Sequence, residues 1–537
     1  MVNTKKNGKP SGKKVKSKVI RPLGYLERYE AALHSLDLYR STMVTCRFAI
    51  PLTLASGRDP KSQAKLEHRV ESAIAKIVLE HPFMRVGLRG EHSTKPAFVE
   101  LETVDFRRHI KWRHLDETET IAFEADLLSL ITSQLDIKID QPEDAPSWRI
   151  LVIEFEKDSR SFVDVMLAAG HAHMDGMSLK IFHEDLLRHL NDSDSNHSTP
   201  AELVNRILTT PSSKRRELPL HQHALYKFPL TPGFVASEFF ALFRPSGGLN
   251  RDLQARWSPI ISTSYAMHYR QFSIDNAALQ NILSVCRQHK TSLTGLLNVL
   301  GHASLAIRLP AEKARAFLGT TIINLRPLMR GPKLKVKSWD LDPNRTMANY
   351  LTQLHHEYGV EWVKKVREVT AKKDENGTGE ENERNQWNAL EPLIWPSAER
   401  VRAVIQERLD EKVENDELGL MSLLSNYRTL VKDKMKKPRT ESLLVTNLGV
   451  IDGGDSPPSD GNGVAATEES GKWTIERAIF SLSAESPTAA LIVSPMSVKG
   501  KELYVGTSWQ DLTMDLAVGY GVAADLESWL RVLGRGS

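Results

Sequence analysis

The sequence predicts an α/β protein made of two similar halves, and three observations support this prediction. The chain has 537 residues, which is more than a single hydrophobic core usually organises. Apolar patterns typical of strands alternate with patterns typical of helices along most of its length. The order of these patterns after about Tyr265 is similar to their order in the first half. We therefore expect two subdomains, each with a sheet packed by helices.

The first half alternates between strand and helix patterns. Strands are predicted at 42–52, 148–156 and 162–170. The last two are joined by a short polar turn, which indicates a hairpin. Apolar residues recur at helical spacing over 66–78, and Pro82 ends this pattern. A further helix is expected over 179–190, with Ser178 as its N-cap.

The second half shows the same kinds of element. Helices are expected at about 275–288, 292–308 and 522–533. Strands are expected at 317–325, 442–447, 472–482, 490–498 and 503–508. The last two should form a hairpin that turns at Lys499 and Gly500. Acidic and Gly-rich stretches near 373–387 and 452–471 have the composition of loop insertions.

Composition divides the chain into four segments. They are a basic disordered tail (1–20), an N-terminal subdomain (21–200), a crossover linker (201–260) and a C-terminal subdomain (261–537). The linker contains an apolar stretch at 233–243. We expect this stretch to pack against the body, with docking on a membrane or covering of a pocket as the alternatives.

Charge and cysteine content exclude several classes of protein. The net charge of +4 is small for this length and does not suggest a nucleic-acid partner. The two cysteines, Cys46 and Cys286, form no CxxC pattern, so we expect no metal site and no disulfide framework. No run of about 20 apolar residues predicts a transmembrane helix. We expect a cytoplasmic protein, and peripheral contact with an endomembrane stays open.

The strongest candidate for chemistry is His171, which follows a predicted strand. Of the 18 histidines, only His171 has an aspartate, Asp175, four residues later, and Gly176 comes next. An imidazole with a pKa near 6.5 is suited to accept a hydroxyl proton at neutral pH. Gly176 is expected to allow a tight turn that points Asp175 into the body. On spacing alone, a buried structural histidine beside a helix-entry aspartate is the alternative. His173 is interpreted as structural, because no third metal ligand lies nearby.

Several motifs resemble those of one enzyme superfamily. Residues 170–178 resemble the His-x-x-x-Asp-Gly signature of the coenzyme A-dependent acyltransferases, which include chloramphenicol acetyltransferase, plant BAHD enzymes and condensation domains. Further similarity lies at 21–29, 291–297, 324–327 and 445–449. The chain lacks the Asp-Phe-Gly-Trp-Gly motif of BAHD enzymes and a fused carrier domain. It is most similar to the alcohol O-acetyltransferase family, over about residues 21–535.

The resemblance implies a fold and a set of site residues. The fold would be two chloramphenicol-acetyltransferase-like subdomains with the active-site tunnel between them. His171 would act as general base, and Asp175 would hold the catalytic loop through an ion pair with Arg326, supported by Gly176. Asn447 would position the thioester or stabilise the oxyanion. The alternative for Arg326 is an exposed structural arginine. The alternative for Asn447 is an asparagine in a strand-end turn.

The resemblance also implies an activity. The protein would be an O-acetyltransferase that uses acetyl-CoA as co-substrate, with no permanently bound cofactor, and acetylates a small-molecule alcohol by direct transfer. A hydrophobic secondary metabolite, such as a sesquiterpenoid of the trichothecene type, is the acceptor class that it suggests. A different acyl donor, an amine acceptor, and a non-catalytic binding member of the fold are the alternatives.

Overall fold

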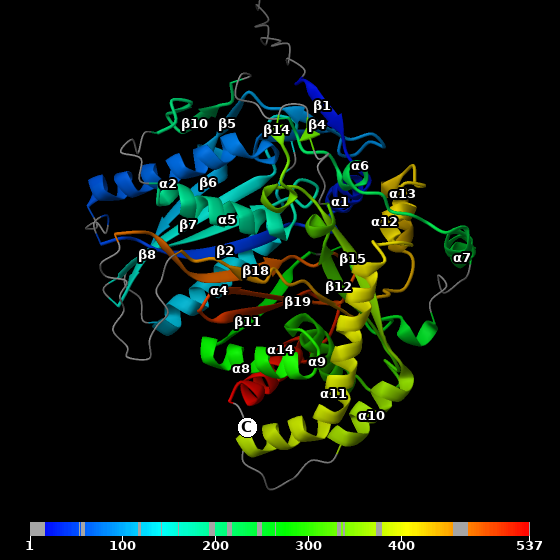
Figure 1. Cartoon of the computed structure of the whole chain (residues 1–537). Coiled ribbons are helices and arrows are strands. Elements are labelled where there is room, and N and C mark those ends of the chain that lie inside the picture. The colour runs from blue at the N-terminus through cyan, green and yellow to red at the C-terminus, as the bar shows by residue number, and fades with distance from the viewer. Residues whose placement is uncertain are drawn as a thin grey trace, which may run out of the picture.

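Figure 1 shows the computed structural model, which describes most of the chain. The described residues are 17–535 without 53, 55–58, 116–119, 141, 159, 193–198, 212–216, 244–249, 264, 330–334, 337–338, 372–378 and 455–470. The predicted α/β class is confirmed, because two large sheets with helices on their faces organise these residues. The stretch 455–470 and the tail 1–16 lie outside the described residues.

The first large sheet has the strand order β18-β2-β8-β7-β6. Its strands are β18 (Thr474–Leu482), β2 (Thr42–Ala49), β8 (Arg160–Ala169), β7 (Trp148–Lys157) and β6 (Ile110–His114). All neighbours in it are antiparallel except β6 and β7. Helices α2 (Pro60–Glu80) and α5 (Gly176–Leu190) pack together beside this sheet. Alternate residues of β2 enter two different cores: Val44 and Cys46 belong to the core of α2 and α5, and Met43 to the core of α4 (Thr120–Asp136).

The second large sheet has the strand order β11-β20-β19-β16-β12-β15, and β17 also pairs with β19. Its strands are β11 (Met267–Ile274), β20 (Leu503–Gln510), β19 (Leu491–Val498), β16 (Leu443–Val445), β12 (Phe317–Asn324), β15 (Leu351–Tyr358) and β17 (Val450–Ile451). The helices that enclose its core are α8 (Asn276–Gln288), α9 (Leu293–Arg308), α10 (Val360–Thr370), α11 (Gly379–Asp410) and α14 (Leu516–Gly534). Parallel pairs (β12 with β16, β16 with β19) and antiparallel pairs occur together, so this sheet is mixed.

Smaller elements complete the described part of the chain. The strands are β1 (Val19–Pro22), β3 (Val86–Arg89), β4 (Ala97–Glu100), β5 (Thr103–Asp105), β9 (Leu203–Val204), β10 (Ile207–Thr209), β13 (Lys335–Val336) and β14 (Trp339–Asp340). The helices are α1 (Tyr25–Ser35), α3 (Phe106–His109), α6 (Gln222–Leu225), α7 (Pro232–Phe243), α12 (Glu417–Met421) and α13 (Tyr427–Lys434). Single 3₁₀ turns lie at Pro82–Arg85, Arg251–Leu253, Arg326–Leu328 and Pro343–Arg345.

The chain crosses between the two sheets at a point that decides where the site forms. Strands β18 and β19 follow each other in sequence, but β18 pairs with β2 of the first sheet and β19 belongs to the second. They remain in contact, since the Ser494 hydroxyl donates to the Phe480 carbonyl at 2.7 Å. The subdomain boundaries 21–200 and 261–537 stay a prediction. Strand β18 lies within the second of these segments but pairs with β2 in the sheet of the first half.

Three expectations from the sequence are corrected. The tail ends earlier than residue 20, because β1 begins at Val19 and pairs with β4. The expected loop at 373–387 is helical from Gly379 onward, since Trp387 is buried in the core that α11 shares with α9 and α14. The apolar stretch at 233–243 forms α7 at the edge of the molecule and leaves Phe240 65% exposed, so it does not pack into the body as expected. No helix among the described residues is both long and apolar enough to cross a membrane.

Candidate active site

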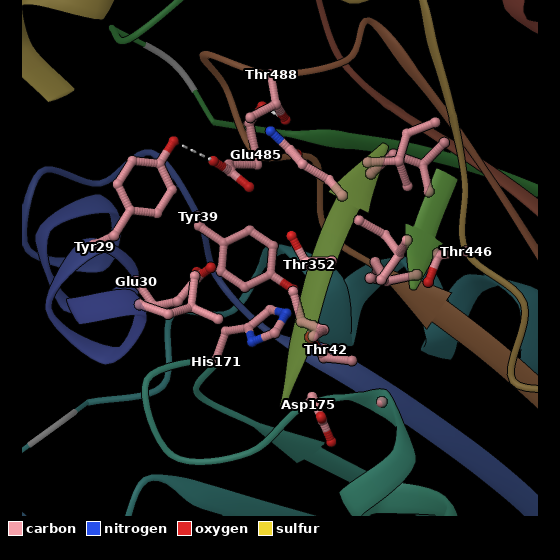
Figure 2. A pocket seen from close by; sticks show the side chains of 18 of the residues that line it. Tyr29, Glu30, Tyr39, Thr42, His171, Asp175, Thr352, Thr446, Glu485 and Thr488 are labelled. Carbon is pink, nitrogen blue, oxygen red and sulfur yellow. Dashed lines mark hydrogen bonds between the residues drawn. The ribbon is translucent and has the colours of Figure 1, made fainter. Parts of the chain in front are cut away.

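A cavity lies where the two halves meet, and both halves line it. The loop after β8 contributes His171, Asp175 and Gly176. Strand β12 and the end of β16 contribute further lining residues from the other side, among them Asn324 and Asn447. Most of the remaining lining side chains are apolar or aromatic, so the cavity has the character of a small-molecule site. Figure 2 shows His171 and Asp175 with other residues of this wall.

Asp175 and Arg326 form a buried ion pair across the interface between the halves. The two guanidinium nitrogens of Arg326 lie 2.7 and 2.9 Å from the two carboxylate oxygens of Asp175, which is a bidentate geometry. Both side chains are almost completely buried. Arg326 also donates to the carbonyls of Thr346 and Ala348, at 3.1 and 3.0 Å. The structure thus brings together two residues that the sequence separates by 151 positions.

Asp175 is also the N-cap of α5. Its carboxylate accepts hydrogen bonds from the backbone N–H and hydroxyl of Ser178, at 2.9 and 2.8 Å, and from the backbone N–H of Tyr350 at 3.0 Å. Burial by itself raises the pKa of Asp175, but Arg326 and these donors outweigh burial and hold the pKa below its ordinary value. The predicted cap, Ser178, is therefore wrong: the helix begins three residues earlier than expected, and Ser178 is a donor to the cap.

Gly176 is needed for close packing and not for a turn. It is the first residue of α5 and does not have a positive φ. A Cβ at this position would lie 2.9 Å from side-chain atoms of Leu448 and Phe480, which belong to the opposite wall of the cavity. The glycine therefore lets the loop at 171–176 approach that wall.

His171 lies at the cavity and has a fixed orientation. Its ring packs 5.7 Å from the ring of Tyr39. The amide of Asn349 donates to the backbone carbonyl of His171 at 2.9 Å and lies 3.3 Å from Nδ1. The imidazole also hydrogen-bonds its own carbonyl. A neutral imidazole keeps a free lone pair on one of its two ring nitrogens, and that nitrogen can accept a proton.

The electrostatic environment keeps the imidazole neutral. Burial lowers the pKa of His171, and the negative charge of Asp175 opposes this only in part. In Figure 2 the Asp175 carboxylate points away from the imidazole. Asp175 and His171 therefore make no direct hydrogen bond in this arrangement, and the carboxylate is directed to Arg326 and the start of α5.

Asn447 lines the same cavity, and its side chain holds a turn. Its amide nitrogen donates to the Thr294 hydroxyl at 3.0 Å, and its oxygen accepts from the backbone N–H of Gly449 at 2.7 Å. These bonds connect the end of β16 with the first turn of α9. The role of Asn447 toward a substrate stays a prediction.

His173 does not reach the cavity. It is buried with its ring in an edge contact to Phe98, at a centroid distance of 5.1 Å. Burial, with a smaller contribution from His34 and Arg21, lowers the pKa of His173 to about 3. It is therefore a neutral residue of the packed interior.

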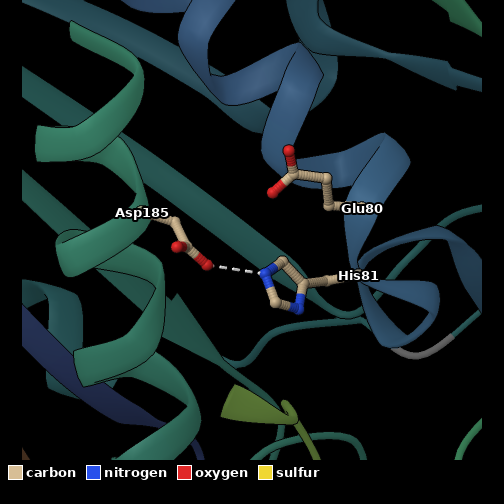
Figure 3. Close-up of side chains that lie close together, drawn as sticks. All are labelled: Glu80, His81 and Asp185. Atoms are coloured by element: carbon tan, nitrogen blue, oxygen red, sulfur yellow. Dashed lines mark hydrogen bonds and ion pairs between the residues drawn. The ribbon is translucent and has the colours of Figure 1, made fainter. Parts of the chain in front are cut away.

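A second cluster of polar side chains lies between α2 and α5. Glu80, His81 and Asp185 offer ligand atoms within 4.8 Å of one another (Figure 3). The same carboxylates are already engaged by arginines: Arg188 lies 2.7 Å from Glu80 and 3.2 Å from Asp185, and Arg345 also binds Asp185. Because these guanidinium groups compensate the acidic charge, we interpret the cluster as an ion-pair network between helices.

Sequence reasoning missed several residues of the site. Asn349, Tyr39, Glu30 and Glu485 all lie at or beside the cavity. Glu30 belongs to an amphipathic helix and Asn349 to a loop after a 3₁₀ turn, and neither carries a local motif. No signal in the sequence distinguishes them from ordinary polar positions.

Together, a His-x-x-x-Asp loop held by a buried arginine and a cavity between two mixed sheets define a protein of the acyltransferase and condensation-domain fold. Solved structures agree on this fold. The TRI3 trichothecene 15-O-acetyltransferase of Fusarium sporotrichioides superposes with a TM-score of 0.65 at 13% identity, covering 96% of this chain and 94% of that one. The first condensation domain of the calcium-dependent antibiotic synthetase superposes with a TM-score of 0.52 at 12% identity, covering 96% and 98%.

Sequence comparisons relate the chain to alcohol acetyltransferases. Residues 110–318 match the alcohol acetyltransferase family. The chain is 28% identical to the probable alcohol acetyltransferase FCK4 of Fusarium pseudograminearum, over 96% of both chains. It is 21% identical to the probable alcohol acetyltransferase crmB of Aspergillus fumigatus, over 91% of this chain and 94% of that one. These matches confirm the predicted relationship to the alcohol acetyltransferase family and support an acetyltransferase activity.

Proposed function

We propose that this protein transfers the acetyl group of acetyl-CoA to the hydroxyl of a small alcohol, with His171 as the general base. The observation that carries the proposal is the placement of His171: it lines a cavity between the halves, Asn349 donates to its backbone carbonyl, and burial lowers the pKa of its imidazole. A general base needs a free lone pair and a fixed position relative to the proton it removes.

The reaction would proceed in a single complex of both substrates. As the alcohol oxygen attacks the thioester carbonyl, the unprotonated ring nitrogen of His171 accepts the hydroxyl proton. Collapse of the tetrahedral intermediate then breaks the carbon–sulfur bond, and the imidazolium gives its proton to the departing thiolate. Holding both substrates at reacting distance in one cavity contributes several kcal/mol by avoiding a bimolecular encounter (about 7–11 kcal/mol in favourable cases).

Direct transfer is favoured over a covalent acyl-enzyme because the cysteines are poor nucleophiles. Cys46 and Cys286 are both buried and free. Burial raises the pKa of the Cys46 thiol, and it raises that of Cys286 to about 12. Two free thiols also fit a reducing compartment, so we propose the cytoplasm as the location.

Asn447 is our candidate for stabilising the oxyanion. One of its amide hydrogens is used by Thr294, so the second remains for a ligand in the cavity. A donor aimed at the developing negative charge lowers the barrier, and removal of one such donor typically costs about 10²–10³-fold in kcat.

The acceptor would be partly hydrophobic, because apolar and aromatic side chains form much of the lining. Hydroxylated terpenoids are one class to test, since the superposed solved structure is a trichothecene 15-O-acetyltransferase. An amine acceptor or a longer acyl donor are the alternative substrates, and product analysis by mass spectrometry separates ester from amide.

The test is thiol release from acetyl-CoA with a panel of primary alcohols and hydroxylated terpenoids. We expect alcohol-dependent release in the wild type and its loss in His171→Ala, with acetyl-CoA binding nearly unchanged. His92→Ala, at an exposed histidine, is the matched control and should keep full activity. If the wild type binds acetyl-CoA and an alcohol but His171→Ala releases thiol at the same rate, the proposed role of His171 is wrong. Binding of both without release would indicate a non-catalytic protein.

A further inference from the structure

The wall of the cavity near His171 carries two acidic side chains that the proposed transfer does not use. Glu30 comes from α1, and Glu485 from the segment after β18. The Tyr29 hydroxyl donates to Glu485 at 3.0 Å. Figure 2 shows Tyr29, Glu30, Glu485 and His171 around the same space. Buried acidic groups are costly unless they are hydrogen-bonded or paired with a positive charge.

Glu30 has one carboxylate oxygen that is left without a hydrogen-bond partner in the described structure. Its side chain lines the cavity while the residue is only 6% exposed, and its Oε2 atom has no hydrogen-bond partner among the described residues. A buried carboxylate oxygen without a partner is rare in folded proteins. The atom is therefore available as an acceptor for a donor on a ligand.

The charges around the cavity do not balance. The carboxylate of Asp175 is compensated by Arg326, and that of Glu417 by His355 at 3.1 Å. For the remaining pair, Glu30 and Glu485, Lys434 is the cation among the described lining residues.

The acidity of the pair reflects this imbalance. Burial raises the pKa of Glu30 to about 8, and burial together with the negative charge of Glu30 raises that of Glu485 to about 8. Lys434 opposes both shifts. The pair therefore lacks one positive charge that would let both carboxylates ionise near neutral pH.

We infer that the acceptor alcohol carries a protonated amine, and that this ammonium group binds between Glu30 and Glu485 while the hydroxyl reaches His171. This inference rests on the proposed function and adds the chemical class of the substrate. An ammonium supplies both missing features: N–H donors for the unpartnered oxygen of Glu30 and one positive charge for the pair. A neutral hydroxyl supplies the donor without the charge, and an apolar group supplies neither.

The test compares alcohols that differ only in this group. Each ω-dimethylamino alcohol is paired with its isopropyl isostere and with the diol of equal length, over chains of three to eight carbons. The tertiary amine cannot itself form a stable amide, so acetylation reports on the hydroxyl alone. Equilibrium binding to the His171→Ala protein is measured by calorimetry for the same compounds, which makes the comparison independent of turnover.

We expect the dimethylamino alcohol to be favoured over both neutral partners by at least ~10-fold in kcat/KM and in affinity, at the chain length that spans the two groups. Glu30→Gln should remove this preference, because an amide keeps the shape of a neutral carboxyl and loses the charge. Glu417→Gln, which also changes a lining glutamate, should retain the preference because that carboxylate is already paired with His355.

Two results would overturn the inference. One is equal or better binding of the neutral partners at every chain length. The other is a preference for the amine that survives in both Glu30→Gln and Glu485→Gln. Failure of the proposed function looks different: the amine is bound selectively through Glu30, yet no alcohol of the panel is acetylated. Conversely, acetylation of neutral alcohols that requires His171, without any amine preference, supports the function and refutes the inference.

Discussion

Removal of Asp175 should destabilise the protein as well as inactivate it. Asp175→Ala leaves the guanidinium of Arg326 buried without its counter-charge, since Arg326 is only 1% exposed. Breaking a buried ion pair by removing one partner costs about 3–5 kcal/mol. Loss of the N-cap of α5 adds about 1 kcal/mol. We therefore expect a total loss of about 4–6 kcal/mol in the free energy of unfolding.

The reverse variant should cost less. In Arg326→Met, Asp175 keeps three donors: the N–H and hydroxyl of Ser178 and the N–H of Tyr350. We expect a loss of about 3 kcal/mol. In the double variant neither charge is left alone in the interior, so its loss should be smaller than the sum of the two single losses by about 2 kcal/mol or more.

Equilibrium urea unfolding at pH 7, followed by tryptophan fluorescence, measures these differences. Asp433→Ala is the control, because its ion pair with Lys436 is exposed to solvent and should contribute little to stability. The folded-state pKa of Asp175 is lowered, so its contribution is present above the unfolded pKa of about 3.9 and disappears as pH falls through the folded value. Losses below about 1 kcal/mol for both single variants, or strictly additive losses, would refute this account.

Three further predictions concern the catalytic loop. Burial lowers the pKa of His171, so kcat/KM should begin to decrease only when the pH is lowered below 6.5. A decrease of kcat/KM that is already half complete at pH 6.5 or above would contradict this prediction. Asn349→Leu removes the donor to the His171 carbonyl and should lower kcat about 10²-fold with an unchanged Kd for acetyl-CoA in calorimetry, whereas an unchanged kcat would exclude the orienting role. Gly176→Ala puts a Cβ 2.9 Å from two cavity side chains and should lower the free energy of unfolding in urea by about 1–3 kcal/mol. Gly233→Ala is the control, because a Cβ at that position would meet no described atom within 4 Å. Equal stability of the two variants would contradict the close packing at Gly176.

Local periodicity made much of the fold predictable. The helix expected over 292–308 is observed as Leu293–Arg308, and the strand expected over 317–325 as Phe317–Asn324. Alternation with period two and recurrence at helical spacing are properties of neighbouring residues, so they are written directly in the sequence. The His171 motif was recognised for the same reason, since its residues lie within one loop.

Helices with a polar composition were harder to predict. Residues 379–387 are rich in Glu and Asn and were expected to form a loop, yet they begin α11. The side chain of Trp387 is buried in the core that α11 shares with α9 and α14, and this burial supplies the stabilisation that local composition does not indicate. Tertiary packing decided the conformation of this segment.

The sequence by itself determined the class of fold, the strand-to-helix junction that carries His171 and the family to which its motifs are related. Only the tertiary structure decided which distant residues meet there: Arg326 with Asp175, Asn349 with His171, and Glu30 with Glu485 in one wall. The physical reason is that such contacts depend on how the sheets assemble, including the transfer of β18 to the first sheet, and not on the spacing of residues along the chain.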